Sequence, residues 1–189
     1  IEHSSISYAT LESLEESFRQ NSRAVFTNTE IATQDGLSIV KKYKNVTVLG
    51  EPGAGKSTFL KKIGLEALSR SKENTGTSEG SYIPVFIELK RVISNDVSLI
   101  SLIEDEFQSS GFPEYFDFSK AFLEHGKLLI LLDGLDEART PEKNYLVEKI
   151  QDFADKYDKN RFIISCRKAA FQTTLRLFHS VLIADFRVS

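Results

Sequence analysis

The chain of 189 residues contains no methionine and no tryptophan, and its only cysteine is Cys166. A single thiol excludes an internal disulfide and suits a reducing compartment, so we expect a cytoplasmic protein. His3, His125 and His179 stand far apart, without cysteine or carboxylate companions at ligand spacing, and we therefore expect no zinc site. Methionine is missing even at position 1. We expect the sequence to be a piece excised from a longer polypeptide.

A strong charge of one sign and a long apolar run are also lacking. The net charge is −3, so the chain has no overall basic character that would favour nucleic-acid binding. Lys127–Leu132 is strongly apolar but far shorter than the roughly 20 residues of a membrane-spanning helix. We expect neither a nucleic acid nor a membrane as partner. The hydrophobic content of 41% is enough for one buried core.

A glycine-rich stretch carries the clearest chemical signal. It fits the phosphate-binding loop pattern G-x-x-x-x-G-K-[ST] at every fixed position, reading Gly50-Glu51-Pro52-Gly53-Ala54-Gly55-Lys56-Ser57-Thr58. Glycines let the backbone adopt positive φ and approach a ligand closely. The N–H groups of such a loop, with the following helix N-terminus, form an anion site. Lys56 would reach the β- and γ-phosphates, and the Ser57 hydroxyl would bind Mg²⁺.

The surroundings of this loop match what a real phosphate-binding loop requires. The apolar, β-branched run Val46–Leu49 ends directly at the loop and predicts a buried strand. Phe59, Ile63 and Ala67 then recur at helical spacing. A chance glycine-rich turn is the alternative. Such a turn has no reason to lie between a predicted strand and a predicted helix, so the flanking patterns disfavour it. We therefore predict nucleotide binding.

A second constellation follows the apolar run Leu128–Leu132, where the sequence reads Asp133-Gly134-Leu135-Asp136-Glu137. A buried strand that ends in an acid is typical of a Walker B element, whose carboxylate holds Mg²⁺. We assign that role to Asp133. Asp136 and Glu137 lie just beyond and are candidates to orient an attacking water, but their spacing does not decide between them. Alternatively, both acids cap the next helix or stay in solvent.

The first part of the chain is predicted to be helical. Leu11, Leu14 and Phe18 form one apolar stripe, and a second short helix is expected near Leu37–Tyr43. Residues 1–44 are therefore interpreted as a helical lead-in that packs against the core. After the loop's own helix, Arg70–Ser81 is rich in Ser, Thr and Gly and is predicted to be a surface loop.

The rest of the chain predicts strands alternating with helices. Further strands are expected at Ile83–Leu89, Arg161–Ser165 and Ser180–Ala184, and helices around Ile100–Phe107, Tyr115–Glu124, Thr140–Tyr157 and Ala170–Phe178. This alternation favours an α/β fold with a parallel sheet covered by helices on both faces.

The two motifs together resemble those of a NACHT domain, one of the signal-transduction ATPases with numerous domains, and Ile83–Leu89 resembles that family's second strand. The resemblance covers roughly residues 45–189. It implies a P-loop NTPase core with five parallel strands in the order 5-1-4-3-2. It also implies an ATP/ADP switch that oligomerises and activates an attached effector. We expect this piece to lack the helical and winged-helix subdomains that usually follow such a core. The Glu-Pro-Gly-Ala-Gly form of the loop is closer to bacterial members, which are associated with antiphage defence.

By position, Arg167 matches the family's sensor 1 arginine, which reads the γ-phosphate. A guanidinium suits that task because it is always charged and bonds phosphate oxygens in pairs. A surface arginine is the alternative. Cys166 beside it is expected to be buried and to pack in the core, and not to act as a nucleophile.

The sequence thus favours the nucleotide-binding core of a signalling switch that binds Mg²⁺ with ATP or ADP and hydrolyses ATP slowly. A P-loop kinase or other metabolic NTPase is one alternative, although no second substrate signature stands out. A scaffold that has lost its chemistry is the other, although Lys56, Ser57, Asp133 and Glu137 are intact. The chain has no guanine-reading Asn-Lys-x-Asp run, which favours ATP over GTP weakly.

Overall fold

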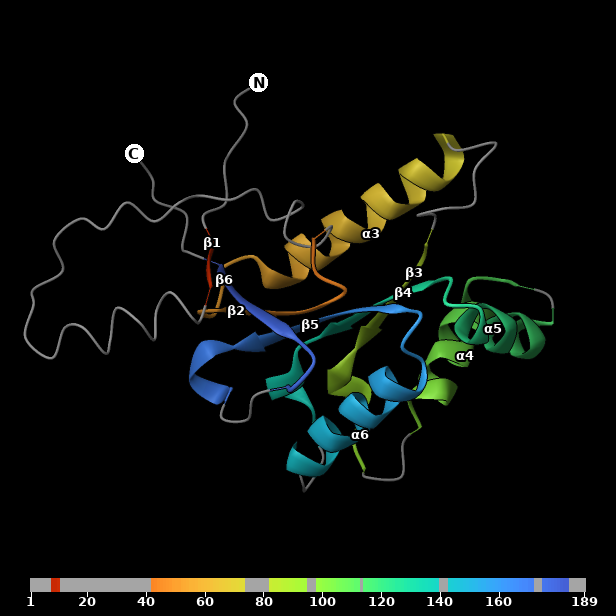
Figure 1. The fold of residues 1–189 in the computed structure, drawn as a ribbon. Coiled ribbons are helices and arrows are strands. Elements are labelled where there is room, and N and C mark those ends of the chain that lie inside the picture. The colour runs from red at the N-terminus through yellow and green to blue at the C-terminus, as the bar shows by residue number, and fades with distance from the viewer. Residues whose placement is uncertain are drawn as a thin grey trace, which may run out of the picture.

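The computed structural model describes residues 8–10, 42–73, 82–94, 98–112, 114–139, 143–171 and 175–183. Its centre is a six-stranded sheet in the order β1-β6-β2-β5-β4-β3 (Figure 1). The strands are β1 (Tyr8–Thr10), β2 (Asn45–Gly50), β3 (Ile83–Glu88), β4 (Leu128–Asp133), β5 (Arg161–Arg167) and β6 (His179–Ile183). From β6 to β3 all neighbours pair in parallel, which confirms the predicted order of the five strands.

The sixth strand was not expected. β1 pairs antiparallel with β6 and extends the sheet at that edge. Its three residues lie inside the segment predicted to be helical, and for them that prediction is wrong. A sheet edge with unpaired N–H and C=O groups is available next to β6, and pairing satisfies those groups whatever the local helical pattern favours. The predicted helical stripe at Leu11, Leu14 and Phe18 lies outside the described residues.

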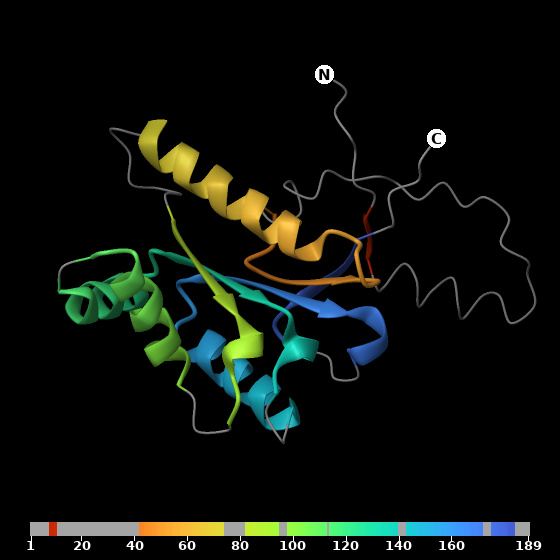
Figure 2. The ribbon, with the colours of Figure 1, turned by 180° about the vertical axis from the view of Figure 1, so that it is seen from behind.

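Helices cover both faces of the sheet, as the alternating pattern predicts. α3 (Lys56–Glu73) crosses one face, and α4 (Leu99–Ser109), α5 (Tyr115–Glu124) and α6 (Lys143–Lys156) lie against the other (Figures 1 and 2). α4 and α5 pack side by side near the β3 edge. The result is a three-layer α/β/α arrangement.

The two cores lie on opposite faces of the sheet, and β4 contributes apolar side chains to both. In β4, Leu128, Ile130 and Leu132 enter the core beneath α4 and α6, and the alternate residues Leu129 and Leu131 enter the core beneath α3. Successive side chains of a strand point to opposite faces, so a parallel strand covered on both sides must be apolar throughout. Burying one such leucine contributes roughly 1.5–3 kcal/mol to stability. Cys166 is 1% exposed in the core beneath α4 and α6, so it is buried, as expected.

Several elements differ from the sequence prediction; β3 ends at Glu88 and β6 begins at His179, each one residue from the expected boundary. α3 continues to Glu73, so Arg70–Glu73 is helical and not part of the predicted loop. β5 runs on to Arg167 instead of ending at Ser165. The helix predicted at Ala170–Phe178 is wrong where the structure describes it: a 3₁₀ turn, η3, covers Lys168–Ala170, and residues 175–178 form a turn. Local apolar spacing could not show these ends, because pairing with β2 sets the length of β5.

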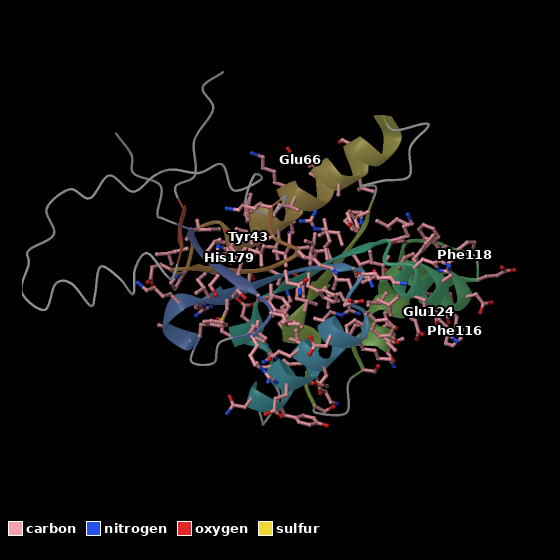
Figure 3. All side chains as sticks on the ribbon, in the orientation of Figure 1. Tyr43, Glu66, Phe116, Phe118, Glu124 and His179 are labelled. Atoms are coloured by element: carbon pink, nitrogen blue, oxygen red, sulfur yellow. The ribbon has the colours of Figure 1, made fainter. Side chains whose placement is uncertain are left out.

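Polar and aromatic contacts fix the ends of strands far from the predicted site. Asn160 is fully buried; its Oδ1 accepts from Leu128 N–H at 3.0 Å and its Nδ2 donates to the Leu123 carbonyl at 2.7 Å. The side chain therefore holds the start of β4. Near the start of β6 the rings of Tyr43 and His179 stack 3.6 Å apart, which holds the chain entering β2 against β6 (Figure 3).

Candidate functional site

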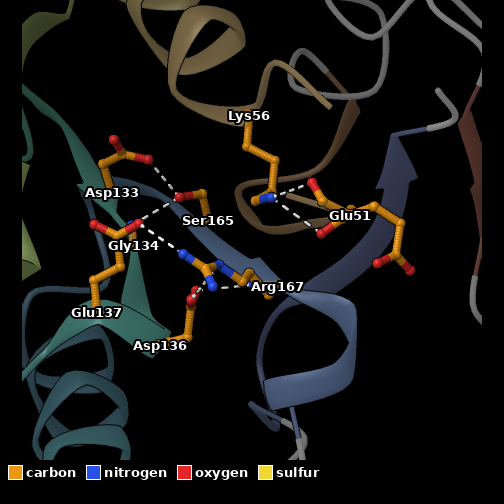
Figure 4. A network of polar contacts seen from close by, with 9 residues as sticks. Glu51, Lys56, Asp133, Gly134, Asp136, Glu137, Ser165 and Arg167 are labelled. Carbon is orange, nitrogen blue, oxygen red and sulfur yellow. Dashed lines mark hydrogen bonds and ion pairs between the residues drawn. The ribbon is translucent and has the colours of Figure 1, made fainter. Parts of the chain in front are cut away.

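The predicted site residues gather where parallel strands end. Gly50 at the end of β2 lies in register with Arg167 at the end of β5. β5 also pairs with β4, which ends at Asp133. Two strand spacings, roughly 10 Å, therefore separate the line of β2 from that of β4. Ligands of open α/β sheets bind at this carboxyl edge, and the phosphate-binding loop and the predicted Mg²⁺ acid share it (Figure 4).

The loop between β2 and α3 has the geometry of an anion site. Gly53 and Gly55 adopt φ of 80° and 83°, values that residues with a Cβ rarely adopt. α3 begins directly at Lys56, so its N-terminal N–H groups face the loop. The Lys56 ammonium donates to the carbonyls of Gly50 at 3.0 Å and Glu51 at 2.9 Å (Figure 4). These oxygens hold the amine inside the loop.

Asp133 is held in place by a serine that the sequence prediction did not include. The Ser165 hydroxyl donates to Asp133 Oδ1 at 2.5 Å and accepts from the Gly134 N–H at 2.8 Å. Ser165 is fully buried on β5. One hydroxyl thus joins the acid to the next strand and satisfies a backbone donor. The available signal was a lone hydroxyl inside the apolar run of residues 162–166.

The chain turns sharply after Asp133 and brings two further acids to the same edge. Gly134 adopts φ of 76°, and the 3₁₀ turn η2 (Leu135–Glu137) follows it. A Cβ at Gly134 would lie 3.2 Å from Glu137 Cδ, so only glycine fits here without displacing that side chain. The turn places Asp136 and Glu137 against the end of β5.

Arg167 contacts both of these acids (Figure 4). Its Nε lies 2.9 Å from Asp136 Oδ2, and its backbone N–H donates to Asp136 Oδ1 at 2.9 Å. Its terminal Nη2 lies 3.6 Å from Glu137 Oε1. The arginine predicted to read a γ-phosphate and the acids predicted to orient water therefore form one ion-pair group. This favours a role at the site over that of an isolated surface arginine.

The donors at this edge fit a magnesium ion bound with nucleotide. Mg²⁺ prefers oxygen ligands and is usually held by one or two protein oxygens together with phosphates and water. Asp133 supplies a carboxylate with a fixed orientation, and Ser57 is an exposed hydroxyl in the first turn of α3. Both are hard oxygen donors, and neither position contains a sulfur or imidazole group that would favour a softer metal.

These features define a P-loop NTPase. The parallel strands have the order of that class, the phosphate-binding loop follows β2, and Asp133 ends β4, which lies two strands away from β2. The NACHT domain family model matches residues 44–189, and the chain belongs to that family. NACHT domains are nucleotide-binding NTPase modules of signalling proteins, and they typically oligomerise. No curated protein matches the sequence. Within the described residues, no helix is both long and apolar enough to span a membrane.

Proposed function

We propose that this chain is the nucleotide-binding core of a switch that binds Mg²⁺ with ATP or ADP and resets by slow ATP hydrolysis. Residues 50–58 bind the phosphates, with Lys56 on the β- and γ-phosphates. Asp133 and Ser57 hold the metal, which neutralises charge on the phosphates when it is bound. Arg167 reads the γ-phosphate, and the acids after β4 orient the attacking water.

One observation carries this proposal: the anion loop, the fixed Asp133 carboxylate and the Arg167 guanidinium lie at the ends of three adjacent strands, β2, β4 and β5. Phosphoryl transfer depends mainly on positioning and charge stabilisation. An anion site, a metal-binding acid and a cation around one edge supply both. Oligomerisation that activates an attached effector, with a role in bacterial antiphage defence, is the further expectation from the family.

The contacts of Lys56 predict how its ammonium responds to a bound triphosphate. Its ammonium bonds two loop carbonyls, which are weaker partners for a cation than an ionised phosphate. We expect the amine to leave these oxygens when a triphosphate enters. Nucleotide binding should also raise the thermal stability of the domain.

Calorimetry and thermal-shift measurements with ATP and ADP, each with and without Mg²⁺, test the proposal. We expect saturable binding of both nucleotides and a rise in melting temperature that grows with nucleotide concentration. Binding of neither nucleotide would favour the scaffold alternative and overturn the proposal. Incubation with γ-labelled ATP separates the switch from the kinase alternative: label released as inorganic phosphate supports the switch, and label transferred to a small acceptor contradicts it.

A further inference from the structure

The two acids that follow Asp133 differ sharply in their surroundings, although they are neighbours in the sequence. The Asp136 side chain is 7% exposed, whereas that of Glu137 is 49% exposed. Both oxygens of Asp136 bond Arg167, one through the backbone N–H and one through Nε, each at 2.9 Å. Glu137 meets the same arginine only through a terminal nitrogen at 3.6 Å, beyond ordinary hydrogen-bond length.

These differences bear on which acid can take a proton from water. A general base needs an oxygen within hydrogen-bond reach of the water that it activates. The oxygens of Asp136 already accept from Arg167, and its carboxylate is nearly closed to solvent. Glu137 is half-exposed and loosely paired, so an oxygen can turn toward the phosphates without breaking a short bond.

The contacts of Asp136 also explain how Arg167 is aimed. A long arginine side chain has many rotamers, and holding one of them requires a partner near the base of the guanidinium. Asp136 bonds both the Arg167 backbone and Nε, which is the guanidinium nitrogen nearest the chain. The terminal nitrogens extend past this anchor, with Nη2 toward Glu137. A fork held in this way remains able to bond a phosphate oxygen.

We infer that Asp136 is a positioning residue that fixes Arg167 toward the γ-phosphate, and that Glu137 alone orients the attacking water. The inference rests on the proposed nucleotide site. The sequence left both acids as candidates to orient water, and the contacts now give each acid a different role. Loss of Asp136 should therefore reduce the ratio of the affinity for ATP to the affinity for ADP. Loss of Glu137 should damage turnover only.

The test compares the affinities of the 189-residue chain for a non-hydrolysable ATP analogue and for ADP by calorimetry with Mg²⁺. The variants are Asp136→Asn, Arg167→Ala, the double variant and Glu137→Gln, with Asp155→Asn on the exposed side of α6 as the matched control. An asparagine keeps the shape of Asp136 but has one acceptor oxygen, so it cannot serve both the Arg167 N–H and Nε.

We expect Asp136→Asn and Arg167→Ala each to lower the preference for the triphosphate by about 10-fold, the effect of one lost charge-assisted hydrogen bond. The double variant should lose no more than Arg167→Ala alone, because both changes remove the same interaction. Glu137→Gln and Asp155→Asn should keep the wild-type preference. A wild-type preference in Asp136→Asn or in Arg167→Ala, or losses that add in the double variant, would overturn the inference.

A nucleotide-free measurement separates this inference from the proposed function. Asp136→Ala should speed hydrogen exchange at the Arg167 amide, because the amide loses its acceptor. Glu137→Ala should leave that exchange rate unchanged. An unchanged rate in Asp136→Ala contradicts the anchor itself. If the anchor is present but the wild-type chain binds no nucleotide, the proposed function fails instead.

Discussion

The Ser165 hydroxyl donates to Asp133 Oδ1 at 2.5 Å, across the boundary between β5 and β4. The same oxygen accepts from the Gly134 N–H at 2.8 Å. A carboxylate at the end of a strand would otherwise be free to rotate about its side-chain torsions. This contact limits that rotation, so the candidate metal ligand is preorganised by a residue on the neighbouring strand.

Ser165→Ala tests that contact. The change leaves the buried Gly134 N–H without its acceptor and releases Asp133, so we expect a stability loss of about 1–3 kcal/mol. Nucleotide affinity in excess Mg²⁺ should fall, and the Mg²⁺ concentration needed for half-maximal binding should rise. Urea denaturation and a Mg²⁺ titration of nucleotide binding measure the two effects. Ser109→Ala, at an exposed hydroxyl on α4, is the control. An unchanged Mg²⁺ requirement would contradict the assignment.

Lys56→Ala should abolish nucleotide binding, because the amine is the only side-chain cation of the phosphate-binding loop. The stability of the free domain should change little, since this side chain is only partly buried and its bonds go to loop carbonyls. Calorimetry with ATP measures the first effect and thermal melting the second. Lys62→Ala, at an exposed position on α3, should bind like the wild type. Retained ATP affinity in Lys56→Ala would refute the role of the loop.

Glu137→Gln should keep nucleotide affinity and slow phosphate release, because an amide cannot accept a proton from water. Losing one general base typically lowers the rate roughly 10²–10⁴-fold. Single-turnover measurement of phosphate release is the appropriate assay, with Glu148→Gln on the exposed side of α6 as the control. Unchanged phosphate release in Glu137→Gln would contradict the water-orienting role of this acid, whatever Asp136→Asn does.

Asn160→Ala should destabilise the fold without touching the site. Its side chain bonds Leu128 N–H and the carbonyls of Leu123 and Tyr157, and it is fully buried. Removing it leaves the Leu128 N–H without this acceptor, at about 1–3 kcal/mol, while the Leu123 and Tyr157 carbonyls still accept from the Gly126 and Asn160 N–H groups. Urea unfolding should show a loss larger than that of the exposed Asn144→Ala. A midpoint equal to that of the control would contradict the structural role.

Local sequence patterns predict much of the fold and of the candidate site. The loop at residues 50–58 carries its own glycines and its lysine, and the apolar run Leu128–Leu132 ends in its acid. Alternating strand and helix patterns imply a parallel sheet. Local patterns gave the wrong prediction where pairing between strands sets the structure. β1 is a strand because it pairs with the edge of β6, and β5 extends to Arg167 because it pairs with β2 along that length.

The sequence by itself determined the chemical groups of the candidate site and the type of the elements that hold them, because both depend on neighbouring residues. Only the tertiary structure decided which groups meet. Ser165 reaches Asp133 over a separation of 32 residues, and Arg167 reaches Asp136 over 31. Those meetings depend on the register between strands, where a slip of one residue would turn each side chain to the opposite face. Packing of the two cores sets that register, and no local pattern encodes it.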